Sequence, residues 1–242
     1  MLWKKKTLGK EKKLIKSEKC MERVPTNIKG FDELIQGGLP KASSILLTGQ
    51  AGSGTTLFAA EYLYKNKATS LYYSFERDKN EIIQELSSFN WNIEERIKQK
   101  QFNIIKNELY QFETFVSNLE DNIDKLNATK VVIDSLTIIG QFFNDEYKLR
   151  KGLIELKNMI KKTGATALFL SEIPENSNKL SSFGLEEFVL DGVIKLDLVQ
   201  KGSELIRTIS IRKMIGTAQD TSTHPLEITP QGLKIPKIRE II

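Results

Sequence analysis

Hydrophobic and polar positions follow two alternating periods over residues 24–190. Short apolar runs predict buried strands at 44–48, 69–75, 102–105, 130–135 and 165–171. Apolar positions at helical spacing predict helices over 55–64, 79–88, 92–99, 112–126 and 146–162. Strands and helices that alternate in this way are typical of a mostly parallel sheet with helices on both faces.

The pattern changes after residue 190. Two strand-like runs, 191–198 and 204–214, flank Lys201-Gly202-Ser203, and two shorter runs, 226–229 and 233–235, flank Pro230-Gln231-Gly232. Turn-forming residues between two such runs predict hairpins. We therefore expect an α/β fold with a mostly parallel central sheet flanked by helices, and antiparallel hairpins at its C-terminal end.

The strand predicted at 44–48 leads into GQAGSGTT at residues 49–56. Phosphate-binding loops read G-x-x-x-x-G-K-[ST], so Gly49, Gly54 and Thr56 are in register and Thr55 stands where lysine is expected. Such loops bind phosphate through backbone N–H groups at the start of a helix, and glycine allows the close approach. The pattern fits a nucleotide site that works without its lysine, a site that has lost its nucleotide, or a chance run of small residues.

Two carboxylates follow other predicted strands. Asp134 ends the run KVVID, where it could help Thr56 hold Mg²⁺, and Glu76 follows LYYSF, where it could orient or deprotonate water. Each has a structural alternative. Many buried strands end in aspartate, and Glu76 could simply cap or salt-bridge a loop.

Composition narrows the class of protein. Hydrophobic residues make up 40% and charged residues 28%, which is typical of a soluble globular protein. No apolar run approaches the ~18–20 residues of a membrane span. The single cysteine, Cys20, and the single histidine, His224, leave no Cys/His metal cluster and no internal disulfide. We expect a cytoplasmic protein.

The net charge of +5 is unevenly placed. Residues 1–20 hold eight lysines against two glutamates, so the remainder is close to neutral. We expect a flexible basic tail at 1–23 and a single domain at 24–242. Such a tail can be disordered or assembly-related, or it can bind nucleic acid or an anionic membrane.

Several blocks in order along the chain resemble one family. They are VPTNIKGFDELIQGGLPKASSILLTG at 24–49, Phe75-Glu76, GLEEFVLDGVI at 184–194, IRKMIGT at 211–217 and HPLEIT at 224–229. With their consistent spacing, nearly the whole chain after residue 24 resembles the KaiC-like ATPase branch of the RecA superfamily, of the type common in archaea.

The resemblance implies a RecA-type core that binds ATP with Mg²⁺ between adjacent subunits of a ring or filament, as a homo-oligomer or with a paralogue. Thr56 and Asp134 would serve Mg²⁺, Glu76 would position water, and Lys213 would reach the γ-phosphate of a neighbouring subunit's nucleotide. The phosphates would be held by Gly49, Gly52, Ser53, Gly54, Thr55 and Thr56.

Three positions depart from the family pattern. Thr55 replaces the loop lysine, Arg77 replaces the second glutamate after the second strand, and Ile215 replaces an arginine. A charge-assisted hydrogen bond contributes ~1.5–3 kcal/mol, so losing the lysine weakens ATP binding by roughly ten- to a hundredfold. Turnover suffers at least as much because charge shifts during phosphoryl transfer. Lys41, Lys213 or Arg77 could supply part of the missing charge.

Three functions remain open. The first is an ATP-binding protein with a weakened site and slow or absent hydrolysis, acting as a regulatory or assembly component. The second is a competent ATP hydrolase with a substitute cation. The third is a DNA-binding recombinase paralogue that uses the fold as a scaffold, although no basic patch with interleaved aromatic residues supports it.

Overall fold

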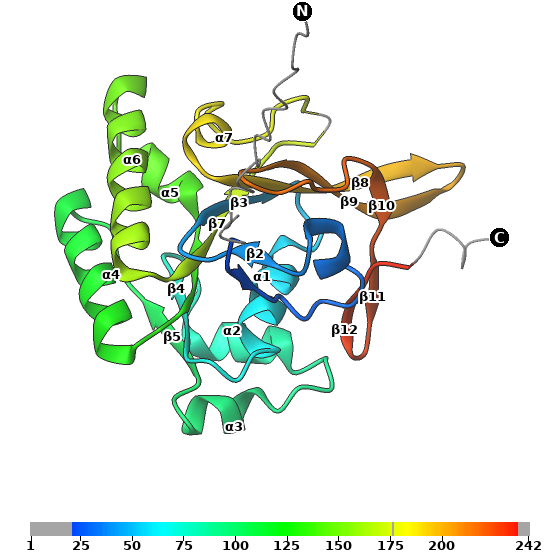
Figure 1. The fold of residues 1–242 in the computed structure, drawn as a ribbon, viewed down its shortest axis with the longest axis horizontal. Coiled ribbons are helices and arrows are strands. Elements are labelled where there is room, and N and C mark those ends of the chain that lie inside the picture. Colours follow the sequence, from blue (N-terminus) through cyan, green and yellow to red (C-terminus); the bar gives the residue numbers. More distant parts are fainter. Residues whose placement is uncertain (1–20, 176, 237–242) are drawn as a thin grey trace, which may run out of the picture.

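The computed structural model describes residues 21–175 and 177–236, and an eight-stranded sheet forms their centre (Figure 1). The strand order is β10-β9-β8-β3-β7-β6-β4-β5. Strands β3 to β8 run parallel to one another, β9 pairs antiparallel with β8, and β10 pairs antiparallel with β9. The strands are β3 (Ser44–Gly49), β4 (Ser70–Ser74), β5 (Phe102–Lys106), β6 (Lys130–Asp134), β7 (Thr166–Glu172), β8 (Gly192–Lys201), β9 (Glu204–Met214) and β10 (Thr223–Pro225).

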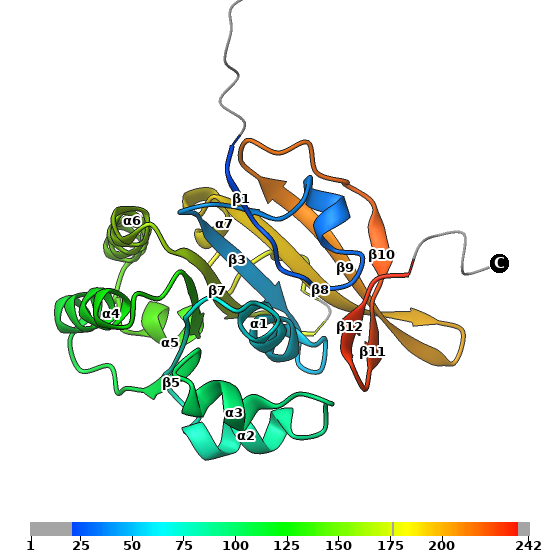
Figure 2. The ribbon, with the colours of Figure 1, turned by 60° about the horizontal axis from the view of Figure 1, so that its bottom comes forward.

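Helices cover both faces of the sheet, as the two views show (Figures 1 and 2). One face packs against α1, α2, α3 and the β11–β12 hairpin, and the other packs against α4 and α6. The helices are α1 (Thr55–Tyr64), α2 (Lys79–Leu86), α3 (Ile93–Lys98), α4 (Phe112–Leu126), α5 (Leu136–Gln141), α6 (Glu146–Thr163), α7 (Glu186–Val189) and the 3-10 helix η1 (Asp32–Ile35).

The expected fold class is confirmed, including the two C-terminal hairpins. β8 and β9 form the first, and β11 (Glu227–Thr229) and β12 (Gly232–Lys234) form the second. The pattern did not reveal η1, α5, α7, β10 and the small pair β1 (Arg23–Val24) and β2 (Leu39–Pro40). These elements have two to six residues, too few for a hydrophobic period to repeat.

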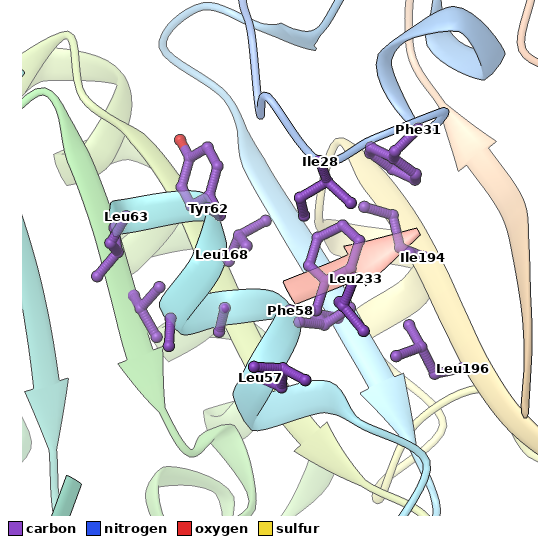
Figure 3. Packing of buried hydrophobic residues seen from close by; sticks show 14 of the residues in the cluster. Ile28, Phe31, Leu57, Phe58, Tyr62, Leu63, Leu168, Ile194, Leu196 and Leu233 are labelled. Atoms are coloured by element: carbon purple, nitrogen blue, oxygen red, sulfur yellow. The ribbon is translucent and has the colours of Figure 1, made fainter. Parts of the chain in front are cut away.

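Helix α1 is buried on nearly every side. Figure 3 shows Phe58 and Tyr62 of α1 among side chains from the strands and the N-terminal segment. The rings of Phe58 and Phe31 pack edge to face, with their centroids 5.0 Å apart. Glu61 is fully buried in the same helix, where it accepts the Leu233 N–H at 2.6 Å and pairs with Lys65 at 2.9 Å. This packing fixes the start of α1 at the end of β3.

Two further expectations from the sequence concern the basic N-terminal tail and the absence of a membrane-spanning segment. Most of the expected basic tail, residues 1–20, lies outside the described residues. Within the described part of the chain, no helix combines the length and apolar character needed to cross a membrane.

Candidate functional site

The site lies where four neighbouring parallel strands end. Gly49 at the end of β3 is level with Glu172 at the end of β7, and Ser74 at the end of β4 is level with Asp134 at the end of β6. The polypeptide after each strand therefore meets at one edge of the sheet. Ligands of open α/β sheets bind at this edge.

The glycines of GQAGSGTT have specific backbone roles. Gly52 and Gly54 have positive φ values of 77° and 104°, which glycine adopts without strain, and α1 begins directly after Gly54. A Cβ at Gly49 would lie 2.4 Å from Ser53 Oγ and 2.8 Å from the Leu196 carbonyl oxygen. The strand, loop and helix thus have the arrangement of a phosphate-binding loop, and a chance run of small residues is a poor explanation of it.

The β8–β9 hairpin supports this loop from the side. Gln50 Nε2 donates to the Leu198 carbonyl at 3.1 Å, and Arg207 Nε donates to the Gly52 carbonyl at 3.0 Å. Sequence reasoning missed Gln50 and Arg207. Their partners lie about 150 residues away, so only the strand order brings them together.

Two cavities open beside the loop. The larger, of about 670 Å³, is lined by Gly49–Gly52, Thr55, Thr56, Thr137, Gln141, Glu172–Pro174, Ser182 and Phe183. The smaller, of about 290 Å³, is lined by Thr55, Thr56, Glu76, Arg77, Asp134 and Leu170–Glu172. Both share Thr55, Thr56 and Glu172, so the start of α1 borders both of them.

Arg77 enters this site, and the structure selects it among the three basic residues considered above. Its Nη2 donates to Thr56 Oγ1 at 3.3 Å and to the Tyr72 hydroxyl at 3.1 Å, and it forms a close ion pair with Asp134 Oδ2. Its Nη1 pairs with Glu85 of α2 at 2.7 Å.

Lys41 and Lys213 lie elsewhere. Lys41 pairs with Glu22 at 2.9 Å, before β3 begins. Lys213 is near the end of β9, close to where β3 begins, and its amine donates to the carbonyls of Glu187 and Leu190 at 3.0 and 2.7 Å. Neither lines the two cavities beside the loop of its own chain.

Asp134 is held by a neutral donor as well as by Arg77. The Tyr72 hydroxyl donates to Asp134 Oδ2 at 2.6 Å. Burial, followed by the charge of Asp134, raises the pKa of Tyr72 well above its usual value, so the hydroxyl keeps its proton. Asp134 therefore has two donors on one oxygen.

Glu172 is a third carboxylate that sequence reasoning missed. It ends a buried strand as Asp134 does, and Glu76 stands just after another. This shared position at a strand end was the available signal. Glu172 is an exposed residue, but partial desolvation of its carboxyl, followed by repulsion from Glu76 and Asp134, raises its pKa. The cavity edge is therefore acidic around Arg77.

The residues expected to serve Mg²⁺ are brought together but do not fit the ion as arranged. The Thr56 hydroxyl and the Asp134 carboxylate both contact Nη2 of Arg77, so an ion between them would meet a guanidinium. Among the described residues, no group of three His, Cys, Asp or Glu side chains could hold a metal.

The fold and this loop define the chain as a RecA-type P-loop ATPase domain. Residues 24–240 match the family described as "ATPase: KaiC", and the chain belongs to that family. Membership implies that nucleotide and Mg²⁺ are used in the family in general.

Relatives and a solved structure agree with this assignment. A UPF0273 protein of Pyrococcus furiosus is 30% identical over 88% of this chain and 93% of its own length. The circadian clock oscillator protein KaiC of Thermosynechococcus vestitus is 30% identical over 89% of this chain. The match covers 44% of that KaiC, so the chain spans less than half its length. The crystal structure of a KaiC-like protein from Pyrococcus horikoshii superposes with a TM-score of 0.82 at 34% identity, covering 90% of this chain and 100% of the other.

We predict that Glu172→Gln stabilises the protein at neutral pH. A carboxyl whose pKa is raised in the folded state favours folding at low pH and loses that contribution as the pH rises through the folded-state pKa. The melting temperature of Glu172→Gln should exceed that of the wild type at pH 7–8, and the difference should shrink toward pH 4.5 as Glu172 becomes protonated. Circular dichroism melts at several pH values measure it. Glu155→Gln, at an exposed position on α6, is the control. A lower melting temperature for Glu172→Gln at pH 7–8 would contradict the prediction.

Proposed function

We propose that this chain binds ATP at residues 49–56 with reduced affinity, hydrolyses it slowly or not at all, and acts as a regulatory or assembly component. The observation that carries the proposal is the loop itself, with Gly52 and Gly54 at positive φ before a buried helix. The start of α1 presents unpaired N–H groups and the positive end of the helix dipole, which favour an anion. The neighbouring cavity of about 670 Å³ is large enough for a nucleotide.

Electrostatics support the reduced affinity. The loop lacks the lysine that reaches the β- and γ-phosphates, and Thr55 has no charge to replace it. Glu76, Asp134 and Glu172 stand at the same edge and repel a polyphosphate. Hydrolysis should suffer more than binding because charge shifts during phosphoryl transfer, where a fixed cation contributes most.

Glu76 and Lys213 have distinct roles in this proposal. Glu76 lines the smaller cavity beside Thr56, where its carboxylate would orient water. Lys213 would act on the nucleotide of a neighbouring subunit. Support for that role comes from its surroundings, since Phe188 of α7 and Ile215 are 68% and 50% exposed near the carbonyls that hold the Lys213 amine. Large exposed apolar side chains that lie close together favour an interaction surface at this place.

The first test is a calorimetric titration of ATP, with excess Mg²⁺, into the wild type and Thr55→Lys. We expect the wild type to bind and Thr55→Lys to bind about tenfold to a hundredfold more tightly, because a charge-assisted hydrogen bond to phosphate is restored. Thr55→Ser is the control and should match the wild type. No heat from the wild type at millimolar ATP, either with excess Mg²⁺ or in EDTA, would refute ATP binding as its function.

A second candidate function is a competent ATP hydrolase with a substitute cation. The position of Arg77 against Thr56 and Asp134 favours it, because a guanidinium there could stabilise charge on a terminal phosphate.

Under this second function, Glu76→Gln should abolish phosphate release while leaving ATP affinity within about threefold. The glutamine keeps the size of the side chain and loses the carboxylate that orients water. The measurement is the rate of phosphate release at saturating ATP. Glu108→Gln is the control, because Glu108 is exposed and lies outside both cavities. Absence of phosphate release above background from the wild type would instead support the first function.

If subunits meet around Lys213, removing an exposed apolar side chain there should weaken the assembly. We expect Phe188→Ser to lower the molar mass of the assembly measured by light scattering, since fully burying one phenylalanine side chain contributes about 1.5–3 kcal/mol. Tyr110→Ser is the control because Tyr110 is 76% exposed and follows β5, at the opposite edge of the sheet. A wild-type protein that remains monomeric at all concentrations, or an unchanged mass for Phe188→Ser, would rule out this interface.

A further inference from the structure

One nitrogen of Arg77 contacts both side chains that the family resemblance assigns to Mg²⁺. Nη2 lies 3.3 Å from Thr56 Oγ1 and forms a close ion pair with Asp134 Oδ2. Nη1 is held 2.7 Å from Glu85, and the backbone N–H of Arg77 donates to Ser74 Oγ at 3.0 Å. The guanidinium is therefore fixed between α2 and the strand ends.

A magnesium ion and this guanidinium exclude each other. Mg²⁺ takes oxygen ligands at about 2.0–2.1 Å in an octahedral shell and usually keeps several waters. An ion on Thr56 with Asp134 in its coordination sphere would fill the space in which Nη2 touches both oxygens. Its two positive charges would also repel the guanidinium at close range.

Arg77 also supplies positive charge to a site that is otherwise acidic. Among the described residues that line the two cavities, Arg77 is the only basic one, and it faces Glu76, Asp134 and Glu172. A triphosphate that enters from the loop needs a cation to offset these carboxylates. The planar fork of arginine matches phosphate oxygens, and the guanidinium stays charged at any physiological pH.

We propose that Arg77 takes the place of the divalent cation, so that the loop binds a nucleoside triphosphate as the free anion. The guanidinium and the N–H groups at the start of α1 hold the phosphates, and the bond between Arg77 and Asp134 keeps Mg²⁺ out. This inference rests on the proposed function that residues 49–56 bind ATP.

The test is a calorimetric titration of ATP into the full chain, once in excess EDTA and once in excess Mg²⁺, at equal ionic strength. We expect ATP to bind in EDTA and to bind at least tenfold more weakly in excess Mg²⁺, because Mg²⁺ complexes ATP in solution and depletes the free anion that the site takes. Binding in excess Mg²⁺ that is tighter, unchanged or weakened less than tenfold would overturn the inference and leave ATP binding intact. Absence of binding in both buffers would refute the proposed function itself, and the inference with it.

Variants separate the role of Arg77 from its effect on folding. In EDTA, Arg77→Ala should weaken ATP binding by about tenfold to a hundredfold, and Mg²⁺ should then strengthen it because Asp134 is released. Arg77→Lys should bind ATP with intermediate affinity in EDTA, since it keeps the charge without the fork. Arg150→Ala, at an exposed position on α6, is the matched control, and circular dichroism melts confirm folding.

The ion pair between Arg77 and Glu85 of α2 separates a phosphate-binding role of Arg77 from a structural one. Glu85→Gln removes the partner of Nη1 and leaves the groups around Nη2 in place. We expect it to change metal-free binding by less than a third of the Arg77→Ala effect. An equal loss in the two variants would mean that Arg77 acts by anchoring α2 and would overturn its role as a cation for phosphate. Metal-free binding by Arg77→Ala that equals the wild type would overturn it as well.

Discussion

The site depends on the burial of α1 against the sheet. Its apolar side chains pack on nearly every side, and even Glu61 is buried and satisfied by Leu233 and Lys65. Because the helix cannot shift, the loop between β3 and α1 is held in a conformation that glycine adopts without strain at positions 52 and 54. The positive end of the α1 dipole therefore stands at a fixed place beside the cavity, ready for an anion whether or not the lysine is present.

Parallel pairing then determines which side chains surround that place. The ends of β4, β6 and β7 bring Glu76, Asp134 and Glu172 to the same edge as the loop. The result is an acidic site around one guanidinium, with a raised pKa at Glu172 as its electrostatic signature. A phosphate site with this balance of charge differs from the usual arrangement, in which lysine and metal supply most of the positive charge.

Much of this arrangement was predictable because it is local or strictly periodic. The buried strands, the helices at 55–64 and 112–126 and the loop between β3 and α1 follow from short-range patterns that sterics and burial impose. Short elements such as α5 and α7 were missed because six and four residues cannot display a period. Glu172 was missed although it directly follows the strand predicted at 165–171, the same kind of position that singled out Glu76 and Asp134.

The sequence by itself determined the α/β class, the glycine loop with threonine at the lysine position, and the carboxylates at two strand ends. Only the tertiary structure decided which cation meets them. Lys41, Lys213 and Arg77 are equivalent on a charge count, but strand order places Arg77 on Thr56 and Asp134 and places Lys213 toward the other end of the sheet. The physical reason is that an ion pair acts over a few ångströms, and which side chains come that close depends on the pairing of strands far apart in the chain.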